Sequence, residues 1–168
     1  QNYAQAFTRS EVVWDPFGGR FVNSFGVSYT NQDRATRTAK GTTGILGLPN
    51  ENLGERTKID WRGNLEIAKG HNLLMGLQYE RERLDTTGLV ASNGNKAAYL
   101  EYQGNIEDRY FLAANIRHGH DDSYGGHTTY RVAPAVIIPG TETKLKASYG
   151  TGFHAPTLSW PVAGTLMI

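Results

Sequence analysis

The sequence predicts an all-β protein, folded as an antiparallel up-and-down meander of about eight strands. Apolar and polar residues alternate through most of the chain, which is the period-two pattern of strands with two different faces. The alternating segments are about ten residues long, the length that a tilted strand needs to cross a bilayer. Short and long connections alternate between them, as they do in membrane-spanning β-barrels. Together these observations favour transmembrane strands.

Composition narrows the class of protein. The 168 residues carry 17 Lys and Arg against 16 Asp and Glu, and a net charge of +1 suggests neither nucleic acid nor an acidic partner. Mean hydropathy is −0.47, and no segment approaches the ~20 apolar residues of a spanning helix. A β-barrel keeps a low average because only every second residue faces lipid. The sequence has no cysteine, which excludes disulfides and cysteine-based metal sites.

The first hairpin has an irregular first strand and a clear turn. Residues 3–14 alternate imperfectly, but Arg9 and Glu11 share one face. Proline and glycine in 15–19 predict a turn, because proline fixes φ and glycine allows positive φ. The second strand is predicted at 20–31, where aromatic and β-branched residues alternate with Ser, Gly and Thr.

The second hairpin is the clearest of the chain. A long polar connection, 32–56, leads to a strand at 57–68 with the cleanest alternation of apolar and polar residues in the chain. A short turn at 69–71 joins it to the fourth strand, 72–84. Residues 85–95 are rich in Thr, Gly, Ser and Asn and predict a second polar connection.

The second half repeats this arrangement. Strands are predicted at 96–106 and 110–119, a loop at 120–126, and further strands at 127–138 and 143–153. Tight turns are expected between the strands of each pair, at 107–109 and at 139–142. Because alternate connections of a meander share an end, the polar connections should lie at one end and the tight turns at the other.

The alternation assigns side chains to two faces, and a slip of one residue would exchange them. The residues expected on the outer, lipid-facing side are Ile59, Trp61, Leu65, Leu73, Met75, Leu77, Leu100, Tyr102, Leu112, Ile116, Val132, Val136, Leu145 and Tyr149. The residues expected to face the lumen are Lys58, Asp60, Arg62, Glu66, Gln78, Glu80, Glu101, Gln103, Arg117, Arg131, Lys144 and Lys146. A soluble sandwich remains the alternative, and a dry core built from the first set would identify it.

The sequence contains few groups of residues that could form a metal, catalytic or ligand site. Imidazole and carboxylate groups gather around the loop 120–126, namely His118, His120, Asp121, Asp122 and His127. These groups can bind transition metals, but their spacing matches no metal motif, and neither a metal site nor another cofactor is expected. No Gly-x-Ser-x-Gly elbow is present and Ser148 and Ser159 lack an evident base, so no enzyme activity is expected. Asn and Asp in 32–56 could bind ligand or Ca²⁺, or line a solvated surface loop.

The end of the last strand carries a family resemblance. Residues 146–160, KASYGTGFHAPTLSW, resemble a segment that recurs in the barrels of TonB-dependent outer-membrane receptors, most closely in the cobalamin- and siderophore-receptor group. Residues 99–159 are similar to the barrel repeats of this family throughout, and 1–11 with 25–34 resemble an earlier hairpin. His154 stands where the family pattern usually has Lys, which keeps a polar residue but not a fixed charge.

The resemblance implies energy-coupled uptake across the bacterial outer membrane of a scarce nutrient complex, an iron siderophore, haem or cobalamin. In this family a plug domain blocks the lumen of a 22-stranded barrel, and an inner-membrane TonB protein pulls on the plug. The implied partners are outer-membrane lipid, the nutrient complex, and TonB through the plug, with no nucleic acid. The charged residues expected to line the lumen, and so the candidate site, are Asp60, Arg62, Glu80, Glu101, Arg117, Arg131, Lys144 and Lys146.

The chain departs from the family pattern in its extent. Residues 1–168 read as part of one barrel domain, and the plug and the remaining strands are not found in them. We therefore expect an open, curved sheet without a ladder between 3–14 and 143–153, and no membrane insertion or transport by the isolated chain. The alternative is a complete eight-stranded outer-membrane barrel with a structural or adhesive role, in which those two strands pair.

Overall fold

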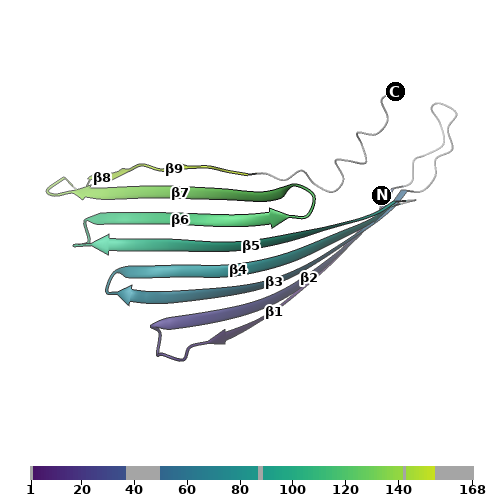
Figure 1. The fold of residues 1–168 in the computed structure, drawn as a ribbon, viewed down its shortest axis with the longest axis horizontal. Coiled ribbons are helices and arrows are strands. Elements are labelled where there is room, and N and C mark those ends of the chain that lie inside the picture. Colours follow the sequence, from purple (N-terminus) through teal and green to yellow (C-terminus); the bar gives the residue numbers. More distant parts are fainter. Residues whose placement is uncertain (1, 37–49, 87–88, 142, 154–168) are drawn as a thin grey trace, which may run out of the picture.

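A computed structural model describes residues 2–36, 50–86, 89–141 and 143–153, and these residues form a single antiparallel sheet (Figure 1). Each strand pairs with the next one along the chain, in the order β1 to β8, and β9 also pairs with β7. The strands are β1 (Asn2–Trp14), β2 (Phe21–Thr36), β3 (Asn50–Ala68), β4 (His71–Thr86), β5 (Leu89–Ile106), β6 (Tyr110–Asp121), β7 (Gly125–Ile138), β8 (Thr143–Lys146) and β9 (Tyr149–Gly150). No helix in the described residues is long and apolar enough to cross a membrane.

The predicted meander is confirmed, and so is the prediction that the tight turns share one end of the sheet. All neighbouring strands are antiparallel, and the turns before β2, β4, β6 and β8 lie together at one end of the sheet (Figure 1). Gly18, Gly19, Gly70 and Gly140 adopt positive φ in three of these turns. Glycine suits such positions because it has no Cβ to clash with the backbone.

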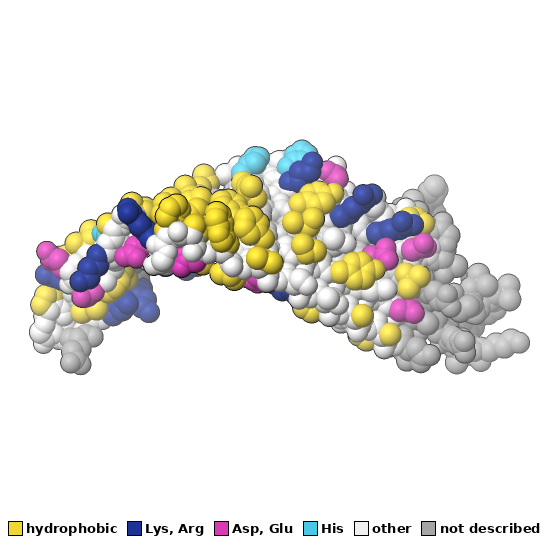
Figure 2. Space-filling model, turned by 90° about the horizontal axis from the view of Figure 1, so that it is seen from below, with side chains coloured by type: hydrophobic (Ala, Val, Ile, Leu, Met, Phe, Trp, Pro, Cys, Tyr) yellow, Lys and Arg dark blue, Asp and Glu magenta, His cyan; other side chains and the backbone are white. Residues whose placement is uncertain are grey.

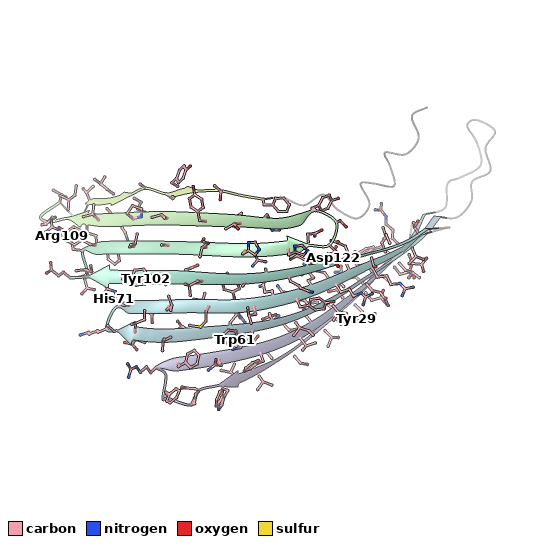
Figure 3. All side chains as sticks on the ribbon, viewed as in Figure 1. Tyr29, Trp61, His71, Tyr102, Arg109 and Asp122 are labelled. Carbon is pink, nitrogen blue, oxygen red and sulfur yellow. The ribbon has the colours of Figure 1, made fainter. Side chains whose placement is uncertain are left out.

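The sheet is a single curved layer without an apolar core (Figures 2 and 3). Ala97 is the only buried hydrophobic residue among those described, and no large side chain is fully enclosed. Leucines and valines that would fill the core of a sandwich, such as Leu77 and Val12, are 55% and 66% exposed. The sandwich is therefore excluded, because its two sheets would bury one face of each strand.

The two predicted sets of side chains lie on opposite faces. Direct cross-strand partners share a face, and the register pairs Ile59 with Tyr79, Trp61 with Leu77 and Met75 with Leu100 on one side. The apolar side chains gather along the convex surface of the arch in Figure 2. The charged set therefore occupies the concave face.

The apolar band crosses the rows of paired residues obliquely. On β2 it is centred on Phe25, whose row passes through Trp61, Leu77 and Ala98 and reaches the polar His118 on β6. On β7 the band extends from Tyr130 to Ile138, which is displaced toward the turn end of the sheet. An oblique band of this kind is expected when strands tilt by about 35–45° from the axis of a barrel.

Strand lengths and loop bounds differ from the sequence prediction. The first seven strands have 12 to 19 residues instead of about ten. The predicted connection at 85–95 is wrong, because β4 continues to Thr86 and β5 begins at Leu89. Within the predicted loop 32–56, residues 32–36 belong to β2 and 50–56 belong to β3, while 37–49 lie outside the described residues. Polar residues continue the ladder here because backbone pairing does not require an apolar face.

The predicted strand at 143–153 is interrupted. It is divided into β8 and β9, which pair with β7 in one unbroken register. Ala147 lies opposite Pro134 in this register and donates its N–H to the Pro134 carbonyl at 3.1 Å. Proline has no N–H to return, so the pair lacks its second hydrogen bond and the ladder is interrupted at this point.

Candidate functional site

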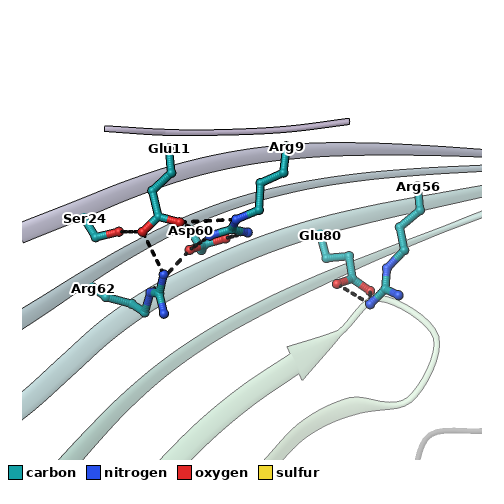
Figure 4. Close-up of polar contacts among 7 residues, drawn as sticks. All are labelled: Arg9, Glu11, Ser24, Arg56, Asp60, Arg62 and Glu80. Atoms are coloured by element: carbon teal, nitrogen blue, oxygen red, sulfur yellow. Dashed lines mark hydrogen bonds and ion pairs between the residues drawn. The ribbon is translucent and has the colours of Figure 1, made fainter. Parts of the chain in front are cut away.

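The concave face carries an ion-pair cluster that joins β1 to β3 (Figure 4), and we call Arg9, Glu11, Asp60 and Arg62 the β1–β3 cluster. Arg9 donates to the two carboxylate oxygens of Asp60 from Nη1 and Nη2, over 3.1 and 3.4 Å. Glu11 accepts from Arg9 Nη2 and from Arg62 Nη2, each over 3.0 Å, and from the Ser24 hydroxyl. Each charge therefore has partners of the opposite sign.

Gly26 on β2 allows a side chain of β1 to reach β3. The register places it directly between Glu11 and Asp60. A Cβ at position 26 would lie 2.7 Å from Arg9 Nη2 and 3.0 Å from Asp60 Oδ2. The guanidinium of Arg9 thus uses space that any other residue at position 26 would fill, which is a typical reason for glycine inside a strand.

Asp60 is the most enclosed member of the cluster. It is only 5% exposed, although it belongs to a single-layer sheet. An enclosed carboxylate is unfavourable unless it is paired and hydrogen-bonded. Arg9 supplies two hydrogen bonds, and Arg62 Nε lies 3.8 Å from the second carboxylate oxygen. The two arginines therefore surround the enclosed Asp60 carboxylate with groups of opposite charge.

Beyond the β1–β3 cluster, the polar side chains of the concave face continue toward β6 with a tyrosine. The ring of Tyr99 on β5 lies directly over Gly76 of β4, where a Cβ would overlap with it. The guanidinium carbon of Arg117 lies 5.9 Å from the centroid of the same ring, within the range of a cation–π contact. A tyrosine hydroxyl and an arginine offer hydrogen-bond donors of the kind that orient polar ligands.

A second ion pair lies nearer the loop end of the concave face. Arg56 Nη2 lies 2.7 Å from a carboxylate oxygen of Glu80 (Figure 4). Arg56 Nε also lies 3.5 Å from a carboxylate oxygen of Glu82. These residues come from neighbouring strands, β3 and β4, which place Arg56 directly opposite Glu82. Exposed pairs of this kind add little stability, but they place polar groups near the loop end of the concave face, where a polar ligand could bind them.

The eight predicted site residues all lie on the concave face, and the structure brings only some of them together. They are Asp60, Arg62, Glu80, Glu101, Arg117, Arg131, Lys144 and Lys146. Asp60 and Arg62 share the β1–β3 cluster, while Glu80 pairs with Arg56 instead. The remaining five lie apart from this cluster, along β5 to β8.

These five residues have varied surroundings. Glu101 accepts a hydrogen bond of 2.6 Å from Gln103 on its own strand. Lys144 Nζ lies 4.4 Å from the ring centroid of Phe111. Within the described part of the chain, Arg131 and Lys146 have no ion-pair partner. Both cations are thus available to an outside group.

Sequence reasoning missed Arg9, Glu11 and Arg56 as site residues. The pattern did place Arg9 and Glu11 on one face, but it gave no register between β1 and β3. That register depends on the intervening strand, and in particular on Gly26, whose position opposite Glu11 creates the gap. A polar pair flanking a glycine on the next strand is the signal that could have pointed to the cluster.

The histidine and aspartate residues near the β6–β7 loop do not form one site. His118 and His120 lie on the convex face with Lys96, whereas His127 and Asp121 lie on the concave face. His118 Nδ1 is 2.8 Å from the Thr128 hydroxyl, and His127 stacks on Phe153 with ring centroids 3.8 Å apart. Among the described residues, no three His, Cys, Asp or Glu side chains are arranged to hold a metal ion.

Comparison with known proteins agrees with this geometry. The family described as "TonB dependent receptor-like, beta-barrel" matches residues 2–165. The vitamin B12 transporter BtuB of Photobacterium profundum is 35% identical over 116 residues, which are 66% of this chain and 19% of that protein. The chain thus spans about a fifth of the length of this curated relative.

Structural similarity supports the fold and extends to a receptor of another ligand. The siderophore receptor PirA from Pseudomonas aeruginosa superimposes with a TM-score of 0.70 at 15% identity, over 93% of this chain and 30% of that one. A glycine dehydrogenase (decarboxylating) of Photorhabdus laumondii matches 48% of the chain but 9% of its own length, and it assigns no activity. The chain therefore belongs to the TonB-dependent receptor β-barrel family of the bacterial outer membrane, and its sheet is part of such a barrel.

Proposed function

We propose that this chain is part of the barrel wall of a receptor that takes up a scarce nutrient complex across the outer membrane. The observation that carries the proposal is the division of one coreless sheet into a convex apolar face and a concave face with fixed charges. Such a sheet needs lipid on one side and water or polar protein on the other. The family match supports uptake as the function.

The ligands of the similar proteins indicate which nutrient complexes to consider. BtuB relatives transport vitamin B12, and PirA is a siderophore receptor. We infer that the transported complex is cobalamin, an iron siderophore or haem. The face that we assign to the lumen supplies positive charge through Arg131 and Lys146, which have no ion-pair partner among the described residues. It also supplies hydrogen-bond donors through Tyr99 and Arg117.

We further propose that the receptor contains more strands and a plug that couples it to TonB. In the described residues β1 and β8 are the two edges of the sheet and do not pair with each other. An open edge is not tolerated in lipid, because each unpaired backbone group costs several kcal/mol. The relatives are about five times longer than the matched segment, which is consistent with further strands.

Nutrient uptake in a deletion strain tests the proposal. The coding region is deleted, and uptake of radiolabelled cobalamin, of a panel of ferric siderophores and of haem is measured with and without the full-length gene. We expect one ligand class to lose uptake and to regain it on complementation, but only in cells that have TonB. Unchanged uptake of every ligand, or complementation without TonB, would refute energy-coupled uptake.

A further inference from the structure

A groove of about 290 Å³ lies on the convex face, next to the turn between β1 and β2. It is lined by Phe17 and Arg20 from the turn, Phe21 from β2, Leu65 from β3 and Met75 from β4. Four of the five lining residues are apolar, and Arg20 is the only charged one. On the opposite, concave face, Arg9 and Arg62 lie within the β1–β3 cluster, so an arginine beside an apolar groove needs a separate explanation.

The groove exists because the sheet has no side chain at Gly63. The register places Gly63 opposite Met75 and next to Leu65. A Cβ at position 63 would lie 3.0 Å from the Phe21 ring and 3.3 Å from Met75 Cγ. Phe21 and Met75 therefore lie low against the sheet, and the space above them is open to an apolar chain.

Arg20 is not neutralised by its own turn. Asp15, the nearest acid in sequence, accepts hydrogen bonds from the backbone N–H groups of Phe17 and Gly19, over 3.3 and 2.6 Å. In the residues that the structure describes, Arg20 forms no ion pair. Arg20 is thus an uncompensated cation with five donors, and it lines the groove together with four apolar residues.

The groove lies at the depth in the membrane where a cation beside an apolar surface is expected. Phe21 is the first apolar residue of β2 on the convex face, and Arg20 precedes it in the turn. The cationic end therefore lies at the edge of the apolar band, where lipid headgroups meet hydrocarbon chains. Short turns face the periplasm in such barrels, so this is the periplasmic leaflet.

We propose that the groove binds one glycerophospholipid of the periplasmic leaflet. Its phosphate accepts hydrogen bonds from Arg20, and one acyl chain lies along Phe17, Phe21, Leu65 and Met75. Guanidinium binds phosphate through paired donors, and apolar contact holds the chain. The proposal rests on the lipid-facing assignment of the convex face, which is part of the proposed function.

Lipid retention by the complete barrel tests the site. The full-length receptor, or BtuB carrying this segment in exchange for its own, is purified in mild detergent with phosphatidylglycerol as the probe. Native mass spectrometry counts the molecules retained per barrel, and heat-modifiable migration on gels reports folding. We expect one retained lipid, an about tenfold loss in Arg20→Gln, and recovery in Arg20→Lys.

Matched variants separate the groove from the rest of the surface. Met75→Phe fills the groove and should release the lipid, whereas Leu77→Phe, on the same strand and face but outside the groove, should not. Lys69→Gln removes a cation from a different short turn and should also have no effect. Equal retention in Arg20→Gln and Lys69→Gln, or in Met75→Phe and Leu77→Phe, overturns the site. A receptor that retains the lipid but imports no nutrient complex refutes the proposed function alone.

Discussion

Two neighbouring residues of β4, Leu77 and Gln78, give the most direct test of which face meets lipid. Leu77 is the third of four apolar residues that β4 contributes to the convex band, and it is 55% exposed in the isolated sheet. Gln78 points to the opposite face, between Asp60 and Ala97. An arginine near the bilayer midplane of a β-barrel costs about 2–4 kcal/mol. This is roughly a 30- to 900-fold change in the folding equilibrium.

The measurement is urea unfolding of the complete barrel in lipid vesicles, with the wild type, Leu77→Arg and Gln78→Arg compared at equal lipid. We expect Leu77→Arg to lower the unfolding free energy by about 2–4 kcal/mol and Gln78→Arg to change it by less than about 1 kcal/mol. The two variants add the same side chain one residue apart, so they differ mainly in the face that receives it. Equal costs, or a larger cost for Gln78→Arg, would show that the faces are assigned wrongly.

Three further perturbations test separate features of the sheet. Gly26→Val should destabilise the barrel by displacing Arg9 from Asp60. Gly54→Val on the same face should be tolerated, since a Cβ there has no neighbour closer than 3.9 Å. Urea unfolding compares the two variants, and equal losses of stability would contradict the role of Gly26. Trp61→Phe removes the donor to the Asn23 side chain, a hydrogen bond of 3.2 Å between two residues of the convex face. The change should cost about 0.6–1.7 kcal/mol, and it should cost less in a chain that already carries Asn23→Ala. Additive losses would argue against the bond. Cysteines placed in β1 and β8 of the isolated chain should fail to cross-link in vesicles, while a cross-linked, heat-modifiable monomer would identify a complete small barrel.

The faces and the turns could be predicted from sequence because both depend on local chemistry. The alternation of Ile59, Trp61 and Leu65 with charged neighbours is enough to assign β3, since the side-chain period of a strand is two. Glycine and proline similarly mark the turns between β1 and β2 and between β7 and β8. No long-range information is needed for either feature.

Strand ends and the charged cluster depend on pairing, which one segment cannot reveal alone. The polar residues before Thr86 and after Leu89 look like a loop, but each finds a partner across the hairpin and the ladder continues. The pairing of Arg9 with Asp60 joins residues 51 apart in the chain and requires Gly26 between them. A single sequence gives no register for strands that distant hairpins bring together.

The stability of this sheet must come mainly from outside the described residues. Hydrogen bonds join all neighbouring strands of the sheet, but a single layer of strands buries little apolar surface. Ala97 is the only buried hydrophobic residue among those described. In the arrangement that we propose, lipid on the convex side would remove the exposed leucines, valines and aromatics from water and so supply the missing hydrophobic contribution. Lipid in turn requires that the open edges of β1 and β8 be paired, because a bilayer offers no hydrogen bonds to them. Membrane insertion and closure with further strands are therefore coupled, and each of them depends on the other.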